Sequence, residues 1–156
     1  MIAKRHLKAK LPKLDNSPNV LLVVANFYSE ITELLVNGAK SVLNEVNANI
    51  ETITVPGALE IPTAVKMASE SFDGFVALGC VIRGETSHYE TVTKDSSRGL
   101  TLLGLEGICI GNGILTVENL DQAEQRANPL AQNKGGEAAV ALINLLSIKN
   151  RFSKSK

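Results

Sequence analysis

Short runs of apolar residues alternate along this chain with longer stretches in which apolar residues recur every three or four positions. The short runs cover residues 20–25, 50–55, 75–82 and 108–114. They predict strands, and the first is continuous enough for a strand that is buried on both faces. Helical spacing follows each run and ends in a last predicted helix, whose apolar stripe is Ala139, Leu142, Ile143 and Leu146.

A strand followed by a helix, four times over with short connections, predicts an α/β fold. We expect a single doubly wound domain over residues 19–150, with a four-stranded parallel sheet flanked by helices in a flavodoxin-like three-layer sandwich. Residues 1–18 are basic, contain two prolines and show no periodicity, so they predict an extended N-terminal arm. Residues 151–156 predict a short basic C-terminal tail.

Composition narrows the classes of function. The chain has 156 residues, 44% of them hydrophobic and 21% charged, as is ordinary for one soluble globular domain. The formal net charge is zero, so nothing global attracts nucleic acid or an anionic membrane. No apolar run is long enough for a membrane span, and no apolar segment follows the basic N-terminus as in a signal peptide. We expect neither a nucleic-acid nor a membrane partner.

The cysteines and histidines add two expectations. Cys80 and Cys109 both fall inside predicted buried strands, which favours two reduced core thiols and a cytoplasmic protein. The chain has only two histidines and no Cys/His cluster at metal-ligand spacing, so we expect no metal site.

The segment 79–90 carries the most specific chemical signal. An apolar strand runs into a glycine turn, and Ser87 and Glu90 have the spacing of a capping box, which predicts a helix beginning at Ser87. His88 then lies in the first helical turn, at the carboxyl end of a buried strand. Ligands of open α/β sheets bind at this edge.

The same segment predicts an anion site beside a proton-transfer group. Gly84, Glu85 and Thr86 can offer backbone N–H groups to a phosphate, and the Glu85 carboxylate should then point away. The His88 imidazole, placed beside this anion site, can act as a general base and then return the proton. A lone histidine is more often structural, but this position favours catalysis.

Each of the other strand ends has its own candidates. Phe27 could stack on a flat heterocycle, although its position alone favours a side chain that closes the core. Gly57, Ala58 and Glu60 lie in a segment made rigid by flanking prolines, where Glu60 could simply complement a helix dipole. Arg126 offers a planar fork that suits phosphate, but alone it is most simply a solvated surface charge.

Taken together, these segments resemble the 6,7-dimethyl-8-ribityllumazine synthase family. The resemblance rests on residues 55–62, residues 81–88, and residues 113–119 with Gln122, Ala123 and Arg126, and it extends over residues 19–150. It implies a transferase of riboflavin biosynthesis that needs no cofactor. That enzyme condenses 5-amino-6-(D-ribitylamino)uracil with 3,4-dihydroxy-2-butanone 4-phosphate to 6,7-dimethyl-8-ribityllumazine, with release of phosphate and water, in the penultimate step of the pathway.

The resemblance also implies a role for each matched residue. Phe27 would stack on the pyrimidine ring, and His88 would transfer protons. The ribityl chain and ring would be held by Ala58, Leu59, Glu60, Cys80, Val81 and Ile82. The butanone phosphate would be bound by main-chain amides of Glu85 and Thr86 and by Arg126.

In this family the site lies between neighbouring subunits. The resemblance therefore implies a pentamer in which Asn112 and Arg126 serve the adjacent chain's site, and in which the N-terminal arm adds a strand to a neighbour's sheet. Asn112 and Leu59 stand where many members carry aromatic residues. The residues after Arg126, including Pro129, differ from those of shell-forming members and favour a pentamer over an icosahedral 60-mer. Association with riboflavin synthase stays open.

Two alternatives belong to other classes of protein. A non-catalytic scaffold that binds lumazine or flavin would be favoured if His88 or Arg126 were absent, and both are present. A flavodoxin or a receiver domain is an analogy of fold alone. A flavodoxin needs a Ser/Thr-rich phosphate loop after the first strand, where this chain has Asn26, Phe27 and Tyr28. A receiver domain needs an acidic cluster at the sheet edge, where this chain has Asn26, Phe27 and His88.

Overall fold

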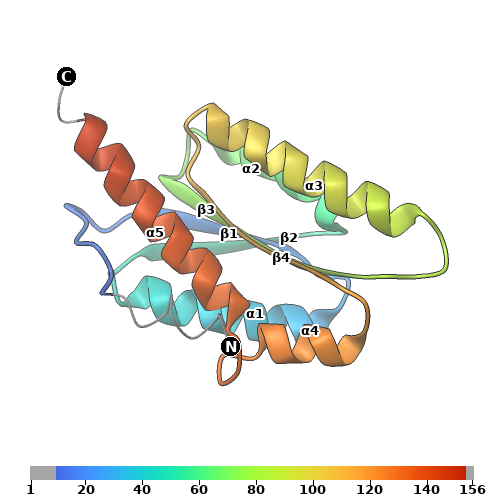
Figure 1. The fold of residues 1–156 in the computed structure, drawn as a ribbon. Coiled ribbons are helices and arrows are strands. Elements are labelled where there is room, and N and C mark those ends of the chain that lie inside the picture. The colour runs from blue at the N-terminus through green and yellow to red at the C-terminus, as the bar shows by residue number, and fades with distance from the viewer. Residues whose placement is uncertain (1–9, 154–156) are drawn as a thin grey trace.

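The computed structural model describes residues 10–153. Strands and helices alternate along the chain (Figure 1). The elements are β1 (Asn19–Ala25), α1 (Ser29–Asn44), β2 (Asn49–Val55), the 3₁₀ turn η1 (Ala58–Glu60), α2 (Ile61–Ala68), β3 (Gly74–Ile82), α3 (His88–Leu105), β4 (Ile110–Val117), α4 (Leu120–Ala127) and α5 (Lys134–Ser153). The strands form one parallel sheet in the order β2-β1-β3-β4. The predicted α/β fold with a four-stranded parallel sheet is confirmed.

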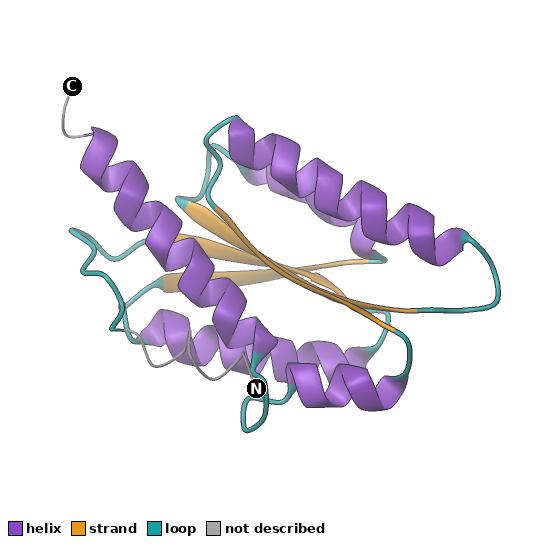
Figure 2. Cartoon of the chain, in the orientation of Figure 1, coloured by secondary structure: helices purple, strands orange, loops and turns teal. Residues whose placement is uncertain are grey.

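Helices cover both faces of the sheet and make a three-layer sandwich (Figure 2). Alternate residues of β1 divide between the two layers because successive strand side chains point to opposite faces. Val20 and Leu22 pack in a cluster with α1, α4 and α5, whereas Leu21 and Val23 pack with α2 and α3. This placement explains why the first apolar run is continuous.

The bounds of β4 differ from the sequence-based expectation. β4 was expected over residues 108–114 but spans Ile110–Val117, because its ladder with β3 runs on to the pair Ile82 and Val117. Asn112 therefore lies in the middle of the edge strand. α4 begins at Leu120, since the Asn119 side chain accepts a hydrogen bond from the Gln122 amide at 2.9 Å and so caps the helix.

Both ends of the chain are partly described. Leu11 and Leu14 lie in the segment expected to be an extended arm. They pack against the core cluster that the sheet forms with α1 and α5. Residues 1–9, which carry most of the expected arm, lie outside the described residues. At the other end α5 continues to Ser153, so the first half of the expected tail is helical.

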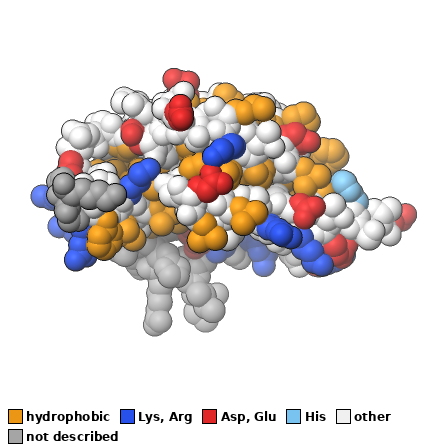
Figure 3. Space-filling model, turned by 90° about the horizontal axis from the view of Figure 1, so that it is seen from above, with side chains coloured by type: hydrophobic (Ala, Val, Ile, Leu, Met, Phe, Trp, Pro, Cys, Tyr) orange, Lys and Arg blue, Asp and Glu red, His pale blue; other side chains and the backbone are white. Residues whose placement is uncertain are grey.

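The surface carries both signs of charge. On the face shown in Figure 3, acidic and basic side chains are interspersed with apolar ones, in keeping with the net charge of zero. No helix within residues 10–153 is long and apolar enough to cross a bilayer.

Close packing of α5 on β4 depends on a glycine. A Cβ atom on Gly111 would lie 1.9 Å from the Ala138 carbonyl oxygen, which is backbone and cannot rotate away. Gly111→Ala is therefore expected to lower the free energy of unfolding by about 3 kcal/mol, measured by urea unfolding. Gly104→Ala is the control, since its Cβ would meet nothing within 4 Å. Equal stability of the two variants would contradict this packing.

Candidate active site

A cleft of about 510 Å³ opens at the carboxyl ends of β1, β2 and β3 and the start of α3. Residues from four separate segments line it, which is the convergence that parallel strands produce. The predicted site residues among them are Phe27, Ala58, Leu59, Glu60, Cys80, Val81, Ile82, Thr86 and His88. The structure therefore brings most of the predicted site together within one subunit.

Phe27 does not close the core. Its side chain is 74% exposed, and its ring meets the Tyr28 ring edge-on, with centroids 5.0 Å apart. The turn that carries both rings is held by the buried Thr32, whose hydroxyl donates a hydrogen bond to Asn26 Oδ1 at 2.8 Å. A fixed, exposed ring at the mouth of a cleft is available to stack on a planar ligand.

The segment after β2 forms a short rigid wall of the cleft. Residues Ala58–Glu60 make a 3₁₀ turn, with the Glu60 amide donating to the Gly57 carbonyl at 3.2 Å, and α2 follows directly with Pro62 in its first turn. Ala58 is buried, whereas Leu59 and Glu60 are exposed and face the cleft. The Glu60 carboxylate and the amides of this turn can therefore contact a polar ligand.

The loop between β3 and α3 is open to anions, but its cap differs from the prediction. α3 begins at His88 with Ser87 at its N-cap position, but the Ser87 side chain makes no cap hydrogen bond. Thr86 Oγ1 accepts from the His88 amide at 3.3 Å instead, and the Glu90 carboxylate pairs with Arg83. The capping box is wrong because a guanidinium is a stronger partner for Glu90 than a backbone amide.

This loop leaves backbone donors free. The amides of Gly84, Glu85 and Thr86 donate no hydrogen bond to any of the residues that the structure describes. Glu85 itself does not line the cleft, whereas Thr86 and His88 do. Free amides beside the start of an 18-residue helix form a favourable place for a phosphate group.

Cys80 lines the cleft but is not a nucleophile. Burial raises the pKa of its thiol to about 11, and burial also raises the pKa of Cys109. The thiol of Cys80 therefore stays protonated at neutral pH, and it contributes shape and apolar surface to the cleft.

A second cleft, of about 390 Å³, lies beside β4, α4 and α5 and contains two other predicted residues. Asn112 and Arg126 line it, together with Thr116, Lys134 and Glu137. The two clefts share no lining residue. The structure thus does not bring Asn112 or Arg126 to His88 within this chain, because Asn112 lies in the middle of β4 and Arg126 lies in the last turn of α4.

The second cleft holds charged groups that the sequence analysis did not assign to the site. Lys134 Nζ lies 2.6 Å from Glu137 Oε2, and Arg126 Nη1 donates to the Gln122 carbonyl at 3.2 Å. The other Glu137 oxygen, Oε1, is buried without a hydrogen-bond partner in the described structure. A buried acceptor without a donor is costly, so this cleft suits a donor from outside the subunit. In the sequence, the only sign of these charged groups was the pair Lys134 and Glu137 at the start of the last helix.

Within the described part of the chain, no group of three or more His, Cys, Asp or Glu side chains could hold a metal ion. The chemistry available is that of an imidazole, backbone amides, a guanidinium and an exposed aromatic ring.

A model of the 6,7-dimethyl-8-ribityllumazine synthase family matches residues 17–150. A 6,7-dimethyl-8-ribityllumazine synthase of Jannaschia sp. is 50% identical over 148 residues, which are 94% of this chain and 83% of that protein. That of Zymomonas mobilis is 53% identical over 135 residues, or 85% of this chain and 97% of that protein. That of Bartonella tribocorum is 49% identical over 150 residues, or 94% and 99%. The chain belongs to the 6,7-dimethyl-8-ribityllumazine synthase family.

Proposed function

We propose that this chain condenses 5-amino-6-(D-ribitylamino)uracil with 3,4-dihydroxy-2-butanone 4-phosphate to give 6,7-dimethyl-8-ribityllumazine, phosphate and water in riboflavin biosynthesis. The observation that carries the proposal is the first cleft. It places an exposed aromatic ring at Phe27, free backbone amides at residues 84–86 and an imidazole at His88 around one space. These are the groups needed for a flat ring, a phosphate and a mobile proton.

The steps of the reaction match these groups. The pyrimidine amine attacks the ketone and water leaves as a Schiff base forms; phosphate is then eliminated, and ring closure loses a second water. The amides of Glu85 and Thr86 hold the leaving phosphate, and His88 moves the protons. Holding the two reactants together can by itself supply several kcal/mol of the barrier reduction.

A complete site on this proposal needs two subunits. Phe27 and His88 line the first cleft, whereas Asn112 and Arg126 line the second, so the contact that joins them brings two different surfaces together. Such a heterologous contact forms a ring when the rotation between neighbouring copies closes. We propose the pentamer as that ring, with Arg126 of one subunit gripping the phosphate bound by its neighbour.

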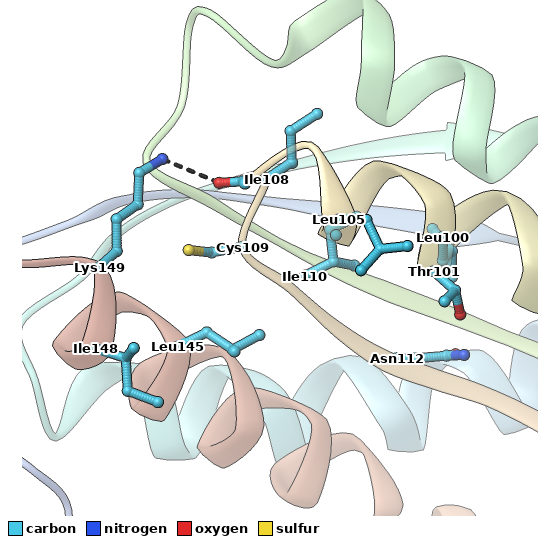
Figure 4. A pocket seen from close by; sticks show the side chains of 12 residues that line it. Leu100, Thr101, Leu105, Ile108, Cys109, Ile110, Asn112, Leu145, Ile148 and Lys149 are labelled. Atoms are coloured by element: carbon cyan, nitrogen blue, oxygen red, sulfur yellow. Dashed lines mark hydrogen bonds between the residues drawn. The ribbon is translucent and has the colours of Figure 1, made fainter. Parts of the chain in front are cut away.

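An apolar hollow beside β4 supports self-association. It has a volume of about 550 Å³ and is lined by side chains of α3 and α5 on either side of β4 (Figure 4). Leu105 is 81% exposed and Ile148 52% exposed in one subunit. Contiguous apolar surface of this kind marks a protein–protein contact. We propose that a second copy covers it.

Three smaller points complete the proposal. The N-terminal arm is proposed to add a strand to a neighbour's sheet, where β2 and β4 are the two edges. Pro129 and the residues around it favour the pentamer over the 60-mer. The two free, buried cysteines fit a cytoplasmic location.

Formation of the lumazine tests the function. The purified chain is given both substrates, and product absorbance and fluorescence are followed while released phosphate is counted. We expect lumazine and phosphate in equal amounts, at a rate well above the spontaneous condensation. Binding of the pyrimidine without any such rate would instead favour a non-catalytic scaffold.

His88→Ala is expected to slow the reaction without abolishing it. General acid–base catalysis by one histidine is worth about 10²–10⁴-fold, and the exposure of His88 lets water replace part of it, so we expect a loss of about 10²-fold in kcat. Added imidazole should restore part of the rate. An unchanged kcat in steady-state assays would remove His88 from the mechanism.

A further inference from the structure

Arg83 sits at a junction of three elements beside the first cleft. Its backbone amide donates to the Val117 carbonyl at 3.0 Å and extends the β3–β4 ladder by one bond. Its guanidinium donates through Nε to both carboxylate oxygens of Glu118, at 3.0 and 3.2 Å, and through Nη1 to Glu90. The guanidinium also lies over the Tyr89 ring, 4.2 Å from its centroid.

These contacts close the loop that carries the phosphate-binding amides. Arg83 immediately precedes Gly84, and its partner Glu90 lies in the first turn of α3, so the ion pair spans the segment 84–89. The free amides and His88 all belong to that segment. Fixing its two ends restricts where these groups can point.

Stability alone does not account for this arrangement. The side chains of Arg83, Glu90 and Glu118 are 40%, 42% and 56% exposed, and ion pairs at such exposure add little to the free energy of folding. Arg83 does not line the cleft, and its Nε and Nη1 already donate to two carboxylates. It is therefore not placed to bind the phosphate itself.

We propose that Arg83 is a positioning residue that holds the loop 84–88 in the geometry that binds the phosphate-bearing substrate; this rests on the proposed function. The planar guanidinium of arginine is needed at this position, because one group must pair with Glu118 and Glu90 at once and stack on the Tyr89 ring. A lysine ammonium is a point charge and cannot do all three.

The same junction reaches toward the second cleft. The Glu118 amide donates to Gln122 Oε1 at 2.9 Å, and the Gln122 carbonyl accepts from Arg126 Nη1. Arg83 thus braces the phosphate loop of one site against the turn that begins α4, the helix that carries Arg126.

The Arg83 hydrogen bond lowers the pKa of Glu90, so the ion pair between Arg83 and Glu90 is intact at neutral pH. It is lost only as the pH falls through that lowered value.

Substrate-specific kinetics of the assembled enzyme test the proposal. In Arg83→Met we expect the KM for 3,4-dihydroxy-2-butanone 4-phosphate and the inhibition constant of inorganic phosphate to rise about tenfold, since small misplacement of binding groups is costly. The KM for the pyrimidine should stay unchanged. Arg83→Lys should remain impaired, whereas Glu118→Gln, which leaves Arg83 and Glu90 paired, should show a smaller effect of the same kind.

Lys66→Met is the matched control, because Lys66 forms a similarly exposed ion pair with Glu106, at 2.6 Å, outside the cleft. Equal changes in both KM values, the same change in Lys66→Met, or full rescue by Arg83→Lys would each overturn the positioning role. Failure of the wild type to form lumazine would instead remove the proposed function. An active wild type with an unaffected Arg83→Met would remove only this inference.

Discussion

Arg126→Ala is expected to lower kcat/KM for the phosphate-bearing substrate about 10³-fold, because losing one partner of a hydrogen-bonded charge pair costs about 2–5 kcal/mol. Arg126 is half-buried, and its hydrogen bond to the Gln122 carbonyl uses Nη1 alone. The other guanidinium nitrogens therefore stay available to bind a phosphate. No other described arginine lines either cleft. The loss should therefore exceed that of His88→Ala, for which water is a partial substitute.

Steady-state rates of the two variants, with both substrates varied, make the comparison. Arg98→Ala serves as the control, since Arg98 is an exposed arginine of α3 that lines neither cleft. A greater loss in His88→Ala than in Arg126→Ala would contradict the proposed division of roles.

Leu105→Asp is expected to split the proposed pentamer into monomers and to reduce activity at least about 10²-fold, because buried apolar anchors dominate the binding energy of protein interfaces. Leu105 is 81% exposed in one subunit, so the charge should cost the folded monomer little. Activity should fall because, in the proposed pentamer, each site draws on two neighbouring chains.

Light scattering after gel filtration measures the mass, and the condensation assay measures the rate on the same sample. Met67→Asp is the matched control: Met67 is 83% exposed, but on α2 and outside the hollow of Figure 4. A Leu105→Asp variant that keeps the wild-type mass and rate would show that the hollow is not the interface.

Much of the fold could be predicted because central strands and peripheral helices impose different periods on the sequence. The β1 run is apolar throughout since helices cover it on both faces, and this pattern needs no knowledge of the rest of the chain. The meeting of Phe27, Ala58 and His88 followed from the same logic, because parallel strands end at one edge of the sheet. The boundaries of β4 were less predictable. Gly111 and Gly113 do not end this strand, because its hydrogen-bonded ladder with β3 continues past them.

Local spacing in the sequence could not predict which partner a side chain would choose. It also could not predict that the expected site residues would lie in two separate clefts. Ser87 and Glu90 have the spacing of a capping box, but Glu90 pairs with Arg83, a residue outside that motif. Phe27 lies just past a buried strand, where an apolar ring more often closes the core, yet it is exposed. The separation of Arg126 from His88 depends on which face of the sheet α4 covers, and no motif reports that.

Subunit mixing tests the central claim, a site shared between neighbours, most directly. Differently tagged His88→Ala and Arg126→Ala chains are coexpressed, assemblies carrying both tags are isolated, and their rate is compared with each parent. Shared sites predict about a quarter of the wild-type activity per subunit, because in a ring one site draws on two chains. Activity no higher than the average of the parents would mean that each site is built within one chain.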